Sequence, residues 1–242
     1  MGKEESPLNI VDYIIIGVIG VSVLFGFYRG FVSSLLNAGS GLVSFGLSFV
    51  LYPKLAAVIQ GNEELVRTLM HYTDASSRIG NLSLATTNVV QMGQEKINEV
   101  LTSVSLPEPL NTMLQVNLES QVFTGTSLTT VNDYVSQTIL QASINILCFV
   151  ACFILTFIAL SLLGSAIRAV FRLPVLKQLD WLAGGVFGLL RGLLLCLVVF
   201  TLVPLLTTML PLDFIMEEIN QSQLAPIFTS GNLIMAIMNG KL

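Results

Sequence analysis

Charge is what this sequence has least of. Lys, Arg, Asp and Glu make up 11% of its 242 residues, whereas a soluble domain carries about 25% charged residues. Hydrophobic residues make up 53% of the chain, and the net charge is −4. This balance excludes an ordinary soluble domain, and we expect no nucleic-acid partner.

Residues that carry chemistry are also scarce. The chain has one histidine and three cysteines, and Cys148, Cys152 and Cys196 all lie inside apolar runs, where a cysteine acts as a small hydrophobic residue. The motifs of zinc proteases, serine hydrolases and phosphate-binding loops do not occur, and no carboxylates cluster with the histidine. We therefore expect a protein that is not an enzyme, with no cofactor and no metal site.

Long apolar runs are what the sequence contains instead. Four runs carry no charged residue: 13–28, 30–53, 134–167 and 192–212. An α-helix needs about 20 apolar residues to cross the hydrocarbon core of a bilayer. The first run is short, but Ile10 and Val11 extend it to that length. The sequence predicts an all-α integral membrane protein with about four transmembrane helices, embedded in a lipid bilayer.

Residues 1–53 are predicted to form an N-terminal pair of transmembrane helices. We expect one helix over about 10–28, a tight turn at Arg29-Gly30, and a second helix over about 31–51 that ends at Pro53, because proline disrupts a helix interior.

The central segment, residues 54–140, differs from the rest in composition. It carries four basic and eight acidic residues, so the acidity of the whole chain belongs to it. Its apolar residues recur at helical spacing: Val90, Ile97, Val100, Leu101, Val104, Leu110, Met113, Leu114 and Leu118. We expect an acidic helical segment outside the membrane, between the second and third transmembrane helices.

Residues 141–211 are predicted to form a C-terminal helix pair, with the third transmembrane helix over about 141–163 and a basic amphipathic loop at 164–180. Such a loop belongs among the anionic headgroups of a cytoplasmic leaflet. The positive-inside rule then places this loop and the 29–30 turn in the cytoplasm. With four spans, both termini, the central segment and the tail at 212–242 lie outside.

Two arginines stand among the apolar residues, each followed by glycine. Arg29-Gly30 and Arg191-Gly192 are each preceded by an aspartate and an aromatic residue that open an apolar run, Asp12-Tyr13 and Asp180-Trp181. This repetition predicts two similar halves in parallel orientation. The functional candidates are Asp12, Arg29, Gly30, Asp180, Arg191 and Gly192.

Arg29 is explained by its position at a cytoplasmic helix end, but Arg191 is harder to place. In one continuous helix over 181–206, Arg191 lies about 15 Å from the helix start, near the bilayer centre. An arginine there costs roughly 2.5 to 3.5 kcal/mol, so it needs protein or water around it and a partner. Asp12 is one candidate, whereas Asp180 lies about 16 Å away along the same helix. Alternatively, 181–190 forms a re-entrant piece and Arg191 lies at the membrane surface.

Small residues recur at helical intervals on several helices. The spacing of four residues from Gly184 to Gly188 and Gly192 creates a surface on which another backbone can approach closely. The candidates for helix packing are Gly184, Gly188, Gly26, Ser33, Asn37 and Ser44. The alternative interpretation is a weakly polar path along the helix bundle.

Taken with these residues, the sequence resembles the colicin V production protein family. Residues 11–32, "VDYIIIGVIGVSVLFGFYRGFV", are similar to the N-terminal signature of that family, and residues 179–195, "LDWLAGGVFGLLRGLLL", to the C-terminal one. "SQLAP", Ser222 to Pro226, is similar to a short family pattern. The resemblance covers about 9–52 and 141–226, and the central segment departs from it as an enlarged insertion.

The resemblance implies four membrane helices in the bacterial inner membrane and a role in bacteriocin production, with links to toxin export and envelope physiology. It supplies no reaction and no substrate. The first hypothesis is a membrane protein that acts through protein partners, with self-association or other membrane and secretion proteins as candidates, and with Arg191 sealed in protein contacts. The second is a small transporter or channel, in which Arg191 and the Ser/Asn stripe of the second helix line a polar path.

Overall fold

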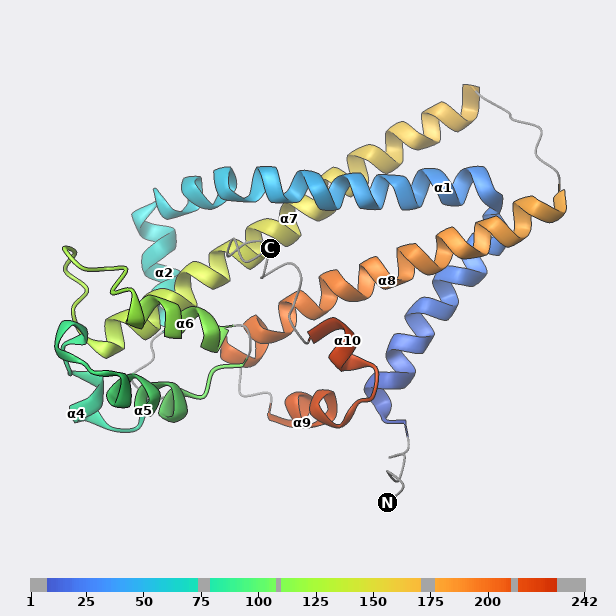
Figure 1. The fold of residues 1–242 in the computed structure, drawn as a ribbon. Coiled ribbons are helices and arrows are strands. Elements are labelled where there is room, and N and C mark those ends of the chain that lie inside the picture. Colours follow the sequence, from blue (N-terminus) through green and yellow to red (C-terminus); the bar gives the residue numbers. More distant parts are fainter. Residues whose placement is uncertain (1–7, 74–78, 108–109, 171–176, 210–212, 230–242) are drawn as a thin grey trace, which may run out of the picture. The chain divides into compact units, whose positions relative to one another are not determined.

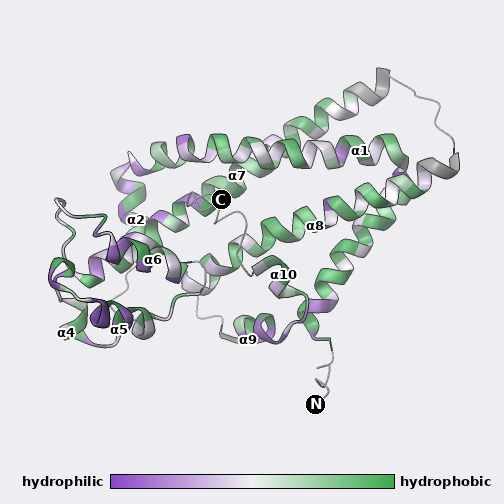
Figure 2. Cartoon of the chain, viewed as in Figure 1, coloured by the Kyte–Doolittle hydropathy of each residue, from purple (hydrophilic) through white to green (hydrophobic). Residues whose placement is uncertain are grey.

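The fold was analysed in a computed structural model, which describes residues 8–73, 79–107, 110–170, 177–209 and 213–229. Within these ranges the regular secondary structure is helical, apart from one isolated β-bridge between Asn88 and Thr130. Three helices are long and apolar enough to cross a membrane (Figures 1 and 2): α1 (Ile10–Gln60), α7 (Val131–Val170) and α8 (Lys177–Met209). The expectation of an all-α protein is confirmed for this part of the chain, and the apolar helices indicate a membrane protein.

The helix α1 bends sharply at Gly30, as Figure 1 shows. Gly30 has φ 76° and ψ 175°, a conformation that glycine adopts without the clash a side chain would cause. The predicted turn at Arg29-Gly30 is therefore confirmed. The first limb, residues 10–29, is about 30 Å long at 1.5 Å per residue, which is the thickness of a hydrocarbon core. Three long helices thus supply the four apolar limbs that the sequence predicts.

The predicted end of the second limb at Pro53 is wrong. The helix continues through Pro53 to Gln60. A proline inside a helix removes one backbone hydrogen bond, and long apolar helices tolerate this where packing restrains the chain. Aromatic packing restrains the chain here, because the ring of Phe149 on α7 contacts the rings of Phe49 and Tyr52, in the turn of α1 before the proline. The helix ends instead at Gly61, whose N–H donates to the carbonyl oxygen of Ala57.

The helix α7 is longer than predicted at both ends. It begins at Val131 because Thr130 and Asp133 cap it: the Asp133 carboxylate accepts from the N–H groups of Thr129 and Thr130, and the Thr130 hydroxyl accepts from the Asp133 N–H. Its last residue, Val170, and the first residue of α8, Lys177, both fall inside the segment 164–180 that the sequence predicts as a loop. Residues 171–176 of that segment lie outside the described residues.

The chain divides into two compact units. Unit 1 comprises residues 1–52, 149–200 and 213–230, and unit 2 comprises 53–148, 201–212 and 231–242. Residues 1–7 and 230–242 lie outside the described residues, and the second range is the last part of the predicted C-terminal tail at 212–242.

Unit 2 is built around an apolar core of its own. Its short helices are α2 (Glu63–Thr73), α4 (Leu82–Ala85), a 3₁₀ turn (Val89–Gln91), α5 (Gln94–Val104) and α6 (Leu110–Glu119). The predicted periodicity is largely confirmed, since these side chains are buried: Ile97, Val100, Val104, Leu110, Leu114 and Leu118. Val90 is the exception and is exposed. The helices α5 and α6 thus turn apolar faces to a common core that includes Val131 and Val135 of α7.

Unit 1 contains most of the apolar helical surface. Its members are both limbs of α1 up to Tyr52, the C-terminal part of α7, α8 up to Phe200, and two short helices, α9 (Asp213–Gln221) and α10 (Ala225–Thr229). Large apolar side chains point outward along these helices, such as Leu24, Leu155 and Val186, each about two-thirds exposed. Contiguous apolar surface on this scale suits contact with lipid.

Candidate functional site

The first limb of α1 and α8 cross in close backbone contact. A Cβ atom placed on Gly26 would lie 2.2 Å from the carbonyl oxygen of Gly184, and one on Gly188 would lie 2.5 Å from that of Ser22. A Cβ atom on Gly192 would meet the Cα atom of Ile19 at 3.1 Å. The glycines proposed for helix packing, Gly26 on α1 and Gly184 and Gly188 on α8, therefore lie in a contact between two helices of the same chain.

The two Arg-Gly pairs differ in backbone conformation, which contradicts the expectation of two similar halves. Gly30 reverses the chain, whereas Gly192 sits in the uninterrupted helix α8. The two glycines differ because of the helix crossing. Gly192 has no side chain, so α1 can approach α8 closely there, and the backbone of α8 remains helical. The same continuity rules out the re-entrant alternative, because residues 181–190 are part of α8.

Arg191 therefore lies well inside a long helix, and the structure gives it no acidic partner. Its Nε atom is buried without a hydrogen-bond acceptor, and no ion pair of Arg191 occurs among the described residues. Asp12, the acid that the sequence offers, is bound elsewhere. Asp180 lies in the first turns of α8, and its side chain is outside the described part of the chain.

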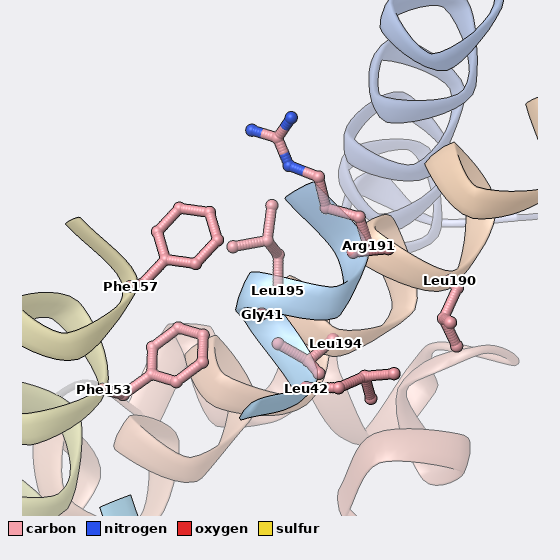
Figure 3. A pocket seen from close by; sticks show the side chains of 9 residues that line it. Gly41, Leu42, Phe153, Phe157, Leu190, Arg191, Leu194 and Leu195 are labelled. Carbon is pink, nitrogen blue, oxygen red and sulfur yellow. The ribbon is translucent and has the colours of Figure 1, made fainter. Parts of the chain in front are cut away.

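Arg191 lines two small pockets of unit 1. Figure 3 shows the more apolar one, which is lined by Phe153 and Phe157 of α7 and by Leu195 of α8; the guanidinium of Arg191 points away from Leu190 and Leu194. The other pocket is lined by Ser22, Phe25, Gly26, Arg29, Ser34, Asn37, Phe187, Gly188 and Arg191. The structure thus brings both predicted arginines to one pocket, with hydroxyl and amide groups beside them.

Asp12 forms a separate site at the start of α1. Its carboxylate is fully buried and accepts from the Ser222 hydroxyl at 2.6 Å, the Leu224 N–H at 2.9 Å and the Asn9 N–H at 3.0 Å. The Gln223 N–H adds a longer contact at 3.3 Å. A buried carboxylate that accepts several N–H and O–H groups is stabilised in its charged form. Asp12 therefore fastens the segment after α9 to the first turn of α1.

Other contacts strengthen this attachment of the C-terminal segment. The Asn9 side-chain amide donates to the backbone carbonyl of Glu218, and Ser222 Oγ also accepts from the Ala225 N–H at 2.9 Å. The rings of Phe200 and Phe228 stack with centroids 5.5 Å apart. The N-terminal end of α1 and the segment 213–229 consequently lie at the same end of unit 1.

The polar stripe on the second limb of α1 begins one residue later than predicted. Ser34, Asn37, Ser44 and Ser48 are all buried, whereas Ser33 is half-buried. Steps of three and four residues keep these side chains on one face of the helix. The hydroxyl groups of Ser34 and Ser48 donate to carbonyl oxygens of Gly26 and Ser44, so part of the stripe is satisfied within α1.

Several residues of these sites are absent from the sequence-based candidates. Ser22, Ser34 and Phe187 join the arginine pocket only through the crossing of α1 with α8, which no local pattern reveals. Ser222 is the partner of Asp12, and the available signal was its place at the start of "SQLAP". The single buried acid of the first helix and a hydroxyl in that pattern form one hydrogen-bonded unit.

Comparison with known proteins decides the family. The family model described as colicin V production protein matches residues 11–107 and 121–232. The chain belongs to the colicin V production protein family. The family match runs through most of residues 54–140, which corrects the expectation that the central segment stands outside the family pattern.

A curated relative agrees with this assignment. The colicin V production protein homolog of Haemophilus influenzae (strain ATCC 51907 / DSM 11121 / KW20 / Rd) is 44% identical over 55 residues. That alignment covers 23% of this chain and 34% of the relative, so the chain spans about a third of the length of the relative it matches. No solved structure matches the chain.

Proposed function

We propose that this protein supports the production or export of a toxin or bacteriocin, and the homeostasis of the envelope, from the bacterial inner membrane. It acts through protein partners and not by catalysis. Membership of the colicin V production protein family supports the biological setting, and the arrangement of unit 2 supports the mode of action.

The observation that carries the proposal is the separate core of unit 2. Val100 and Leu114 are fully buried in it, while the polar faces of α5 and α6 carry exposed acids such as Glu95, Glu99 and Glu119. A stable helical body with an acidic outer face is suited to binding a basic partner surface. Self-association or other membrane and secretion proteins are the candidate partners.

The proposed topology follows the positive-inside rule. The 29–30 turn and the basic segment 164–180 are cytoplasmic, and the termini and residues 54–140 are outside. The hydrogen bond between Asp12 and Ser222 supports the placement of the N-terminal helix start and the segment 213–229 on one side. Aromatic residues support an interface near Arg29, because Trp181 stacks on Phe27 with centroids 4.4 Å apart, and Tyr28 is exposed.

Charge reversal on α5 tests the proposal. In a producing strain that lacks the native gene, the double variant Glu95→Lys, Glu99→Lys should leave the protein in the membrane at normal amounts but reduce the toxin released into the medium. The matched control is Lys96→Glu on the same helix, which makes the surface more acidic and should retain function. Normal toxin release by the double variant would contradict the proposal.

A second candidate function is a small transporter or channel, and Arg191 favours it. The partner hypothesis expects this arginine sealed in protein contacts, yet it is partly exposed and lines two pockets. If transport is the function, Arg191→Met should abolish toxin release, while charge reversal on α5 should leave it unchanged. The two sets of variants therefore separate the candidates.

A further inference from the structure

We propose that the pocket formed by Arg29, Arg191, Ser22, Ser34 and Asn37, here called the arginine pocket, binds a phosphate group. The group is carried either by an anionic phospholipid or by a free phosphate. The proposal concerns a binding site, and it holds whether the protein acts through partners or as a transporter.

The first argument is uncompensated charge. Arg29 and Arg191 both line the arginine pocket, and neither Asp nor Glu is among the residues that line it. Arg29 lies over the ring of Phe25 at 6.0 Å, a contact that compensates a cation only weakly. Like charges repel one another, and a cation well inside a long apolar helix, as Arg191 is, is costly without a counter-ion. An anion between them would remove both penalties.

The second argument is a set of unused donors. The Ser22 hydroxyl is buried, with 7% of the residue exposed, and has no hydrogen-bond partner. The Nε atom of Arg191 is likewise buried without an acceptor. Buried polar groups are nearly always hydrogen-bonded, so such exceptions indicate an absent partner. Asn37, 8% exposed, adds an amide to the same lining.

The number and kind of donors suit a phosphate group. Arg29, Arg191, the Ser22 hydroxyl and the Asn37 amide together offer several N–H and O–H donors for its oxygens. Arginine also binds phosphate oxygens through paired, charge-assisted hydrogen bonds. The pocket contains about 210 Å³ of space free of protein atoms, including its open side.

The surroundings of Arg29 fit contact between this side of the pocket and lipid headgroups. Arg29 precedes the bend at Gly30, and the aromatic pair Phe27 and Trp181 stacks beside it. Amphipathic aromatic residues gather where a membrane helix meets the headgroup layer. Phe25 and Phe187 supply apolar walls on which acyl chains or glycerol carbons would rest.

Ligand-induced stabilisation of the purified full-length protein tests the proposal. The midpoint temperature of thermal unfolding would be measured in a neutral detergent with added phosphatidylglycerol, with inorganic phosphate and with phosphatidylcholine. We expect the midpoint to rise to a plateau with increasing ligand, by more than phosphatidylcholine raises it. A rise with phosphatidylglycerol alone assigns the phosphate to lipid, and a rise with inorganic phosphate as well assigns it to a free anion. Both results support the site.

Variants show whether the arginine pocket is responsible. Arg191→Met should weaken binding at least tenfold, the effect of losing one charge-assisted contact, and should leave the ligand-free protein no less stable, since an unpaired cation is removed. Arg29→Gln, at an exposed position, should also weaken binding and covers the case in which Arg191→Met does not fold. Arg67→Gln removes an equal charge from α2 and should bind as the wild type does.

Two results would overturn the proposal: no saturable rise with either phosphate source, or a rise that Arg191→Met and Arg29→Gln leave as strong as in Arg67→Gln. Because toxin release is not part of this assay, failure here would leave the partner-based function standing. Failure of the α5 variants would likewise leave the binding site standing.

Discussion

Asp12 and Arg191 both place a charge inside unit 1, and the chain treats them in opposite ways. Asp12 is fully buried, and its two carboxylate oxygens accept from Asn9, Ser222 and Leu224. Arg191 remains without an acceptor for Nε. A buried charge whose hydrogen bonds are all made within the protein rigidifies the structure, whereas one that lacks a hydrogen-bond partner is costly and would be stabilised by a ligand. We therefore assign Asp12 to architecture and Arg191 to binding.

Asp12→Asn tests the architectural role at the scale of one residue. The amide keeps the shape but turns one acceptor into a donor that faces existing donors, so about 1 to 3 kcal/mol of stability should be lost. The segment 213–229 should then be cleaved faster in limited proteolysis of the purified protein. Ser222→Ala removes one of the bonds and should cause a smaller change. Equal cleavage of Asp12→Asn and the wild type would show that this contact does not hold the segment.

At the scale of helices, the crossing of α1 with α8 depends on glycine. Gly188→Ala would place a Cβ atom 2.5 Å from a backbone oxygen of α1, and backbone cannot move aside as a flexible side chain can. We expect a loss of about 1 to 3 kcal/mol, measured as a lower midpoint of thermal unfolding in detergent.

Gly17→Ala is the matched control for this crossing. Gly17 lies in the first limb of α1, the limb that crosses α8, and a Cβ atom added to it would have no atom within 4 Å. Alanine is the better helix former, so this variant should be as stable as the wild type or more so. If both variants unfold at the same temperature, the close contact between the helices does not exist.

The core of unit 2 gives a prediction within a single helix. Leu114 on α6 is fully buried, and Val116 on the same helix is 39% exposed. Leu114→Ala should cost about 2 to 5 kcal/mol through the cavity that it leaves, whereas Val116→Ala should change stability by about 0.5 kcal/mol or less. Hydrogen exchange of the amides in α5 and α6 would report the difference. Similar protection in both variants would place Leu114 outside the core.

The elements were predicted well from the sequence where local physics determines them. Long apolar runs predicted the long apolar helices, and Gly30 predicted the bend, because chain length and backbone sterics act locally. The ends of helices were predicted less well: Pro53 does not end α1, since ring contacts with Phe149 and the stop at Gly61 decide instead. The start of α7 depends on a cap at Thr130 and Asp133 that lies outside the apolar run.

Sites were harder to predict because they join residues far apart in the chain. The sequence identified Asp12, Arg29 and Arg191 as unusual, since charge among apolar residues is rare. It did not identify their partners: Asp12 was one candidate partner of Arg191, whereas the structure shows Asp12 bound to Ser222, 210 positions later. The identity of a lone charge is thus visible in sequence, but its partner depends on the tertiary fold.

For the molecule as a whole, the account describes a membrane protein in which the bend of α1 and the crossing helix α8 create an arginine pocket at one end of unit 1. The other end of that unit carries Asp12 and the docked segment 213–229. In the topology proposed above from the positive-inside rule, the arginine end faces the cytoplasm. The central claim is that the arginine pocket opens to water on the cytoplasmic side.

Thiol labelling in cells and in inverted vesicles tests this claim most directly. With the three native cysteines replaced by alanine, single cysteines would be placed at Phe187, which lines the arginine pocket, and at Leu189 on the apolar exterior. Gln221, exposed on α9, serves as the control for the opposite side. The account predicts that a membrane-impermeant reagent labels Phe187→Cys in inverted vesicles only, Gln221→Cys in cells only, and Leu189→Cys in neither. Labelling of Phe187→Cys from the outside, or none while Gln221→Cys reacts, would contradict it.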